Sequence, residues 1–127
     1  MAESEKDYFP SGDLEISQWD RNSFLADVAK QFRGSYVHIT TAGPLPGEVR
    51  NCRLEHIITE ADAITFSLAC DQDSETRYSI ANPERMTVHR NSSGVTESVE
   101  IVSLDGSVTR VWFGDAAERA AEGDLAA

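Results

Sequence analysis

The clearest strand in the chain is predicted by the stretch ITFSLAC, residues 64–70. Its side chains alternate between an apolar set, Ile64, Phe66, Leu68 and Cys70, and a small or polar set, Thr65, Ser67 and Ala69. Because successive side chains of a strand point to opposite faces, this alternation places the two sets on different faces. The stretch therefore predicts a strand with one buried face.

Short segments with similar alternation lie on both sides of this stretch, between Ser35 and Phe113. They are separated by residues that favour turns, such as Gly43-Pro44 and Asn82-Pro83. The further predicted strands are Tyr36–Ile39, Val49–Ile58, Tyr78–Ile80, Met86–His89, Val99–Leu104 and Val108–Phe113.

The last two segments flank Asp105-Gly106, a pair that is typical of a tight two-residue hairpin turn. With that turn, one face is expected to carry Val99, Ile101, Val108, Arg110 and Trp112, and the other Val102, Leu104, Val111 and Phe113. Both faces are apolar, so both are expected to be covered. The cover is either the rest of the domain or another molecule.

One helix is predicted before the strands, from Ser17 to Arg33. Phe24, Leu25, Val28 and Phe32 recur at helical spacing and form one apolar stripe. Two starts fit: a capping box of Ser17 and Asp20, or a cap at Asp20 with Trp19 packed on Phe24. Gly34 supplies a left-handed stop.

These elements predict a single α+β domain, with residues 1–16 and 115–127 as acidic flexible tails and residues 17–114 as the folded part. In this fold an N-terminal amphipathic helix packs on a strongly bent antiparallel β-sheet or small β-barrel of about five to seven strands.

Composition narrows the function classes. The net charge of −11 repels the negative phosphate backbone of nucleic acids, so no nucleic-acid partner is expected. A basic protein partner is compatible with this charge. No apolar run approaches the roughly 20 residues that span a bilayer, and the N-terminus lacks the apolar section of a secretory signal. We therefore expect a cytoplasmic protein without a membrane partner. In that compartment Cys52 and Cys70 are expected to be free thiols, although the sequence leaves a disulfide open.

No motif in the chain supports a reaction mechanism, a cofactor or a metal site. The three histidines, His38, His56 and His89, lie in separate strand segments without zinc-type spacing. The acidic residues of segment 71–75 are spaced like the start of a calcium loop, but Thr76 and Asn82 replace the glycine and glutamate that such a loop needs. These features favour a non-catalytic protein over an enzyme and leave the enzyme question open.

Two resemblances support this layout. One helix followed by short strands, with a stiff connection after the first strand, resembles Sm-like and SH3-like small barrels. The pattern Trp19…Phe24-Leu25, Gly34-x-x-Val37, Ile80-x-x-Pro83-x-x-Met86-x-Val88, Val99-Glu100-Ile101 and Asp105-Gly106 is similar to a family of small uncharacterised bacterial proteins. The second resemblance implies a bacterial domain. It implies no activity, because that family has no assigned activity.

The function predicted from these features is a non-catalytic protein–protein interaction module or assembly subunit, whose partner is another protein or a second copy in a homodimer. Aromatic and arginine side chains dominate interface energies, so the candidate interaction residues are Arg110, Trp112, Tyr8 and Phe9. Two alternatives stay open: a small-molecule-binding or minor hydrolytic domain with a pocket between helix and sheet, and an acidic mimic of nucleic acid.

Overall fold

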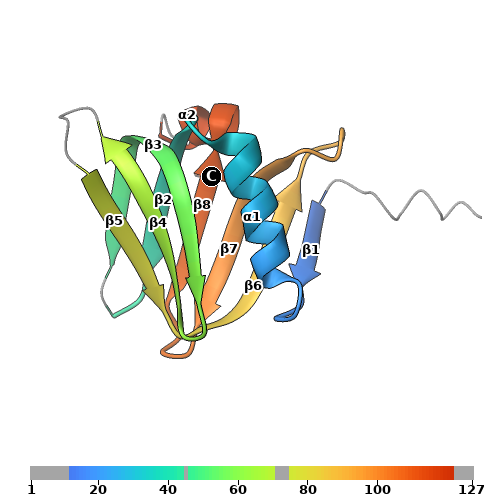
Figure 1. Cartoon of the computed structure of the whole chain (residues 1–127), viewed down its shortest axis with the longest axis vertical. Coiled ribbons are helices and arrows are strands. Elements are labelled where there is room, and N and C mark those ends of the chain that lie inside the picture. Colours follow the sequence, from blue (N-terminus) through green and yellow to red (C-terminus); the bar gives the residue numbers. More distant parts are fainter. Residues whose placement is uncertain (1–11, 45, 71–74, 122–127) are drawn as a thin grey trace, which may run out of the picture.

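A computed structural model describes residues 12–44, 46–70 and 75–121 of the chain. Within these ranges the chain forms eight strands and two helices, coloured along the sequence in Figure 1. In chain order they are β1 (Gly12–Ile16), α1 (Arg21–Phe32), β2 (Tyr36–Ala42), β3 (Gly47–Glu60), β4 (Ala63–Cys70), β5 (Glu75–Ala81), β6 (Pro83–Arg90), β7 (Thr96–Ser103), β8 (Val108–Phe113) and α2 (Gly114–Ala121).

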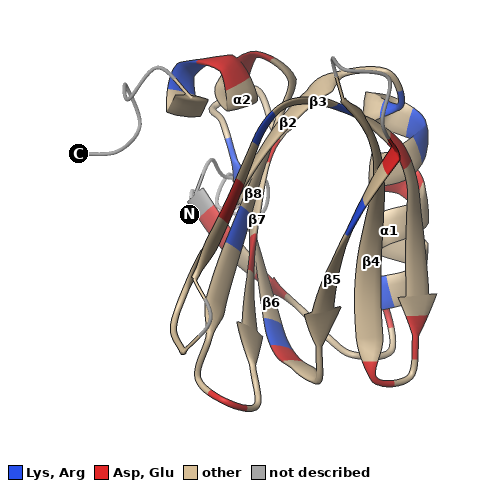
Figure 2. Ribbon diagram, turned by 90° about the vertical axis from the view of Figure 1, so that its left-hand side faces the viewer, with Lys and Arg blue, Asp and Glu red and all other residues tan. Residues whose placement is uncertain are grey.

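All eight strands belong to one antiparallel sheet in the order β1-β6-β7-β8-β2-β3-β4-β5. The sheet bends back on itself, so β4 and β5 face the strands around β8 across the interior (Figure 2). Helix α1 contacts β3 and lies on the same side of the molecule as β4, whereas α2 lies on the opposite side (Figure 2). The molecule thus has two layers with an interior between them and an outer face on each.

The bend occurs in β3, whose 14 residues belong to both layers. Its first part pairs with β2 and its later part with β4, and the register shifts in both ladders near the middle of β3. Asn51 lies at this point with a φ of 64°, a left-handed backbone conformation that strands otherwise avoid. An irregularity of this kind acts as a β-bulge, which turns a strand and increases its twist.

The core fills the space between the layers. Leu25 and Val28 of α1 share one buried cluster with side chains from β2 to β8, including Phe66 and Phe113, which are at most 2% exposed, and Ile16 of β1 packs against this cluster. The run at residues 64–70 behaves as predicted, since Ile64, Phe66 and Leu68 are all buried. Burial of this apolar surface is the main term that stabilises the bent sheet.

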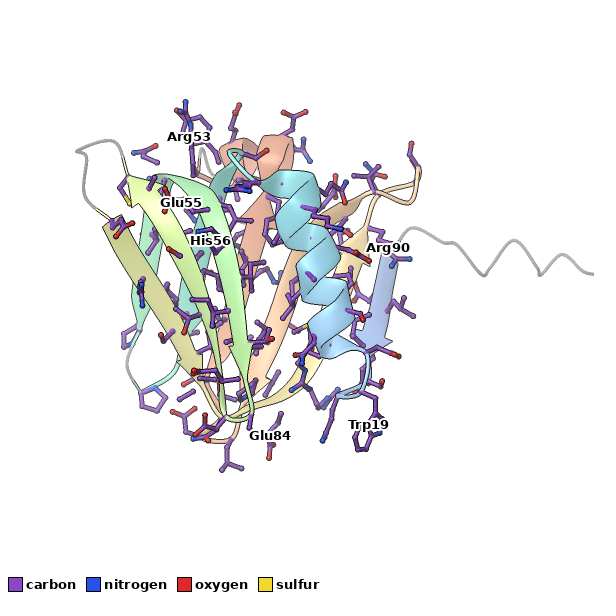
Figure 3. All side chains as sticks on the ribbon, in the orientation of Figure 1. Trp19, Arg53, Glu55, His56, Glu84 and Arg90 are labelled. Atoms are coloured by element: carbon purple, nitrogen blue, oxygen red, sulfur yellow. A yellow bond between two sulfur atoms is a disulfide. The ribbon has the colours of Figure 1, made fainter. Side chains whose placement is uncertain are left out.

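Helix α1 has the second of the two predicted starts, because its N-cap is Asp20. The expected packing of Trp19 on Phe24 is wrong, since Trp19 is 86% exposed and projects away from the fold (Figure 3). Gly34 has a φ of 83°, which fits the predicted left-handed stop. Neither described helix is long and apolar enough to cross a bilayer.

The predicted fold class is wrong in four respects. The described chain opens with strand β1 and not with a helix, and a helix that was not predicted, α2, closes it at the C-terminal end. The sheet has eight strands and not five to seven, and it is open, with β1 and β5 at its edges. Strand β1 and helix α2 lie in segments that the sequence assigned to tails, so the folded part extends beyond residues 17–114 at both ends.

The predicted faces of the last hairpin are also wrong. Val99 pairs with Val111 and Val102 with Val108, so the loop holds three residues, Leu104 to Gly106, instead of two. A shift of one residue exchanges the two faces of a strand. Val99 and Ile101 therefore share the core with Val111 and Phe113, while Arg110 and Trp112 lie on the outer face.

The expectation of free thiols is wrong as well. Cys52 of β3 and Cys70 of β4 are direct partners in the ladder, with 4.1 Å between their Cα atoms, and they form a disulfide. Both cysteines carry apolar neighbours on the same face, and that pattern alone does not separate a buried thiol from a bridge.

Candidate functional site

A row of polar and aromatic side chains crosses the outer face of β1, β6, β7, β8 and β2. Each member is the ladder partner of the next: Asp13, His89, Ser98, Trp112 and His38. We call these five residues the outer row. Facing side chains on neighbouring strands lie within contact distance of one another, so five strands distant in sequence build one continuous surface.

Two hollows adjoin this row. The larger has a volume of about 330 Å³ and is lined by Asp13, Thr87, His89, Glu97, Ser98, Glu100, Arg110 and Trp112. The second, of about 230 Å³, is lined by residues 40–42 of β2 together with Val108. Glu100, Arg110 and Trp112 line both hollows and therefore stand between them. We refer to the larger hollow as the groove.

Trp112 is held from two sides. The His38 ring lies 5.4 Å from its ring centroid, and the Arg110 guanidinium lies 5.8 Å above its ring, within the range of a cation–π contact. Arg110 also pairs with Glu100, its ladder partner on β7. These contacts fix the orientation of the indole ring at the edge of the groove.

His38 is the buried end of the outer row, with only 3% of its surface exposed. Burial lowers its pKa, and this effect outweighs the opposing attraction of Glu48, whose Oε2 lies 3.4 Å from Nε2. None of the described residues hydrogen-bonds the other ring nitrogen, Nδ1, which is buried. The ring is therefore neutral near pH 7.

The opposite end of the groove holds a chain of charged contacts. Asp13 Oδ1 lies 2.9 Å from His89 Nδ1, and Glu97 Oε1 lies 3.8 Å from His89 Nε2. Arg119 of α2 reaches down to Glu97 at 3.1 Å. This contact ties α2 to β7.

Asp13, His89 and Ser98 have the residue types of a serine hydrolase triad, but their geometry does not provide its chemistry. The second nitrogen of His89 faces Glu97, and none of the described contacts joins His89 to the Ser98 hydroxyl. Ser98 lies within a strand that is paired on both sides. The backbone N–H groups next to it donate hydrogen bonds to the neighbouring strands, so they cannot form an oxyanion hole. The arrangement suits binding better than acyl transfer.

The remaining candidate residues do not join this site. Tyr8, Phe9, Asp71 and Asp73 lie outside the described residues. His56 is on the exposed side of β3, in the other layer from the outer row (Figure 3), so the three histidines do not converge. Within residues 12–44, 46–70 and 75–121, no three His, Cys, Asp or Glu side chains are grouped to hold a metal ion.

A third cavity, of about 180 Å³, opens where the β5 edge meets the β7–β8 turn. Thr41, Tyr78 and Thr109 join their hydroxyl groups there across the interior. None of these cavities is lined by a residue of α1. A smaller cavity of about 100 Å³ lies between α2 and the sheet and is lined by Tyr36, Val37, Asn51, Ala117, Glu118 and Ala121. The pocket expected between the N-terminal helix and the sheet stays a prediction.

No protein-family model, curated protein or solved structure matches the chain. The predicted relation to a bacterial family stays a prediction, and the site has to be interpreted from its own chemistry.

Arg110 and Trp112 are the two predicted residues that the structure places in the site. Asp13, Ser98, Glu97 and Glu100 were not predicted as site residues. Asp13 lies in a segment that was assigned to a tail, and Glu97 has the same alternation as the core residue Val99 but lies at the register shift between β6 and β7. Only the outward direction of Ser98 and Glu100, which alternate with the core residues Val99 and Ile101, could be predicted. The convergence of the four residues could not, because it depends on strand pairings between segments up to 76 residues apart.

Proposed function

We propose that this protein is a non-catalytic interaction module that binds a segment of another protein along the outer face, across the groove. The observation that carries this proposal is the position of Arg110 and Trp112, at the boundary shared by two hollows. Residues that dominate binding are typically Trp, Tyr and Arg near the centre of an interface. The contacts of Trp112 with His38 and Arg110 add to this, since a side chain that is already ordered loses little entropy on binding.

The charge distribution favours this proposal over the nucleic-acid mimic. Acidic and basic residues are interspersed along the strands of the sheet (Figure 2). A mimic needs carboxylates ordered in series along one face, and the described residues do not offer such a series.

The test begins with selection of short peptides from a displayed random library on the intact protein. Selected peptides are then titrated into wild type, Trp112→Ala and Trp19→Ala by calorimetry. We expect Trp112→Ala to weaken binding at least about tenfold, because it removes the central contact. Trp19→Ala is the matched control, since Trp19 is 86% exposed on the turn before α1, away from the groove.

Arg110→Ala serves as a second variant, because its side chain is outside the core and its loss should leave the fold unchanged. Circular dichroism confirms folding of each variant. Selected peptides that bind Trp112→Ala and Arg110→Ala as tightly as wild type would contradict the proposal.

A second copy of the chain is also a candidate partner for this face. Sedimentation equilibrium distinguishes the two cases: a dimer that Trp112→Ala converts to a monomer identifies self-association. If the wild-type protein is a monomer at every concentration, the partner of this face is another protein.

A further inference from the structure

The lining of the groove carries an excess of negative charge. Asp13, Glu97 and Glu100 contribute three carboxylates, whereas Arg110 contributes the one guanidinium among the lining residues. Arg119 approaches from α2 and contacts Glu97. Since the whole chain also has a net charge of −11, the field around the groove attracts cations and repels anions.

The existing contacts of these carboxylates leave some of their hydrogen-bond acceptor positions free. Glu97 accepts from Arg119, Glu100 from Arg110, and Asp13 contacts His89. An ionised carboxylate has about four acceptor positions, so each could accept another N–H donor without losing its present partner. Glu97 and Glu100 are also partly shielded from water, with side chains 24% and 33% exposed, which reduces the screening of their charge.

The floor of the groove supplies a second, independent feature. Ser98 is only 6% exposed and lines the groove, yet its hydroxyl makes no hydrogen bond with any residue that the structure describes. Among the described residues, the buried side-chain atoms without a partner are Arg21 Nε and His38 Nδ1, so the Ser98 hydroxyl is reachable from the groove and is available to bond a ligand there. Trp112 faces Ser98 across the β7–β8 ladder and lines the groove beside it, with the Arg110 guanidinium already over its ring.

We infer that the groove binds a basic segment of the partner protein, with a lysine or arginine side chain between Glu97, Glu100 and Trp112 and one of its N–H groups donating to the Ser98 hydroxyl. This inference rests on the proposed function and specifies the chemistry of the partner. It excludes acidic segments, because three carboxylates would repel them.

The test uses three short peptides of equal length: one with spaced arginines, one with glutamine in their place and one with glutamate. The protein has two tryptophans, so Trp19→Phe leaves Trp112 as the reporter of binding by fluorescence. We expect the arginine peptide alone to quench Trp112, and we expect its affinity to fall as salt rises from about 50 to about 500 mM.

In the same Trp19→Phe background, Glu97→Gln and Glu100→Gln should each weaken the arginine peptide about two- to fivefold. Glu84→Gln is the matched control, because it removes the same charge from the end of the molecule near Trp19 (Figure 3). Ser98→Ala, which removes the unpartnered hydroxyl, should weaken the peptide by a similar factor.

Equal affinity for the arginine and glutamine peptides, independent of salt, would overturn the inference on charge. The same holds if Glu84→Gln weakens binding as much as Glu97→Gln does. In either case the proposed interaction module would still be supported if Trp112→Ala weakens the binding of the selected peptides. Selected peptides whose affinity is the same for wild type, Trp112→Ala and Arg110→Ala would contradict the proposed function itself.

Discussion

His38 places an ionisable ring in a position where its charged form is costly. Burial lowers its pKa from the ordinary value of 6.5; the attraction of Glu48 raises the pKa by less than burial lowers it, and repulsion from Arg50 adds a smaller lowering effect. Because the folded-state pKa is lower than the unfolded one, protonation favours the unfolded chain. The stability that neutral His38 contributes is therefore complete above about pH 6.5 and is lost as the pH falls towards the lower folded value.

We accordingly expect the melting temperature to fall by a few degrees between about pH 7.5 and 5.5, and His38→Phe to remove most of that decrease. Phenylalanine keeps an aromatic ring beside Trp112 and carries no buried nitrogen without a partner. Differential scanning calorimetry over this range measures the effect, with the exposed His56→Gln as control. An equal decrease in His38→Phe would show that other groups cause it.

Glu48 responds in a separate and more acidic range. The hydrogen bond from Arg50 lowers its pKa below the ordinary value of 4.5. Its contribution is present above that value and is lost as the pH falls below it. The two groups can thus be told apart by the pH at which each acts.

Among the elements, β3 depends most on a single backbone conformation. Asn51 has a φ of 64° and is exposed, so its role is to turn the strand and not to fill the core. We expect Asn51→Gly to change the free energy of unfolding by no more than a few tenths of a kcal/mol, whereas Asn51→Val should destabilise by about 1–2 kcal/mol.

Urea unfolding of the two variants provides the measurement. The result discriminates because ordinary strand propensity predicts the opposite sign, with valine better than asparagine or glycine. A more stable Asn51→Val would mean that β3 does not need the left-handed residue at its bend.

The β7–β8 hairpin shows how far the sequence could predict an element. Two strands and a turn at Asp105-Gly106 could be predicted from the sequence pattern, and Gly106 indeed has a φ of 90°. The loop length was not readable, because a three-residue loop with glycine in the left-handed region uses the same residues. One residue of slip then moved Val99 and Ile101 to the opposite face from Arg110 and Trp112.

The two missed elements have a different cause. Strand β1 has five residues and pairs with β6, more than 70 positions away, while α2 contains small alanines. Neither has a strong local pattern, and each is stabilised by tertiary contacts, such as Arg119 with Glu97. Strand β1 supplies Asp13 to the groove, and Arg119 of α2 contacts Glu97, so these two parts of the site could not be predicted from the sequence.

At the scale of the whole molecule, the Cys52–Cys70 disulfide lies where the chain passes between the two layers. Cys52 follows Asn51 directly, and Cys70 ends the strand that pairs with the far part of β3. The bridge closes a loop of 18 residues, which in the chain-entropy estimate stabilises the fold by about 3 kcal/mol. The β3–β4 ladder extends well beyond the bridge, so the fold should persist without it.

We therefore expect a reductant to lower the free energy of unfolding of the wild type by about 2–4 kcal/mol without changing its circular dichroism spectrum. The double variant Cys52→Ala/Cys70→Ala is the control, because its stability should not respond to reductant at all. A thiol assay confirms that the bridge has opened. If the reduced wild type unfolds at the same denaturant concentration as the oxidised protein, the bend is held by the ladders and core alone, and the bridge adds no stability.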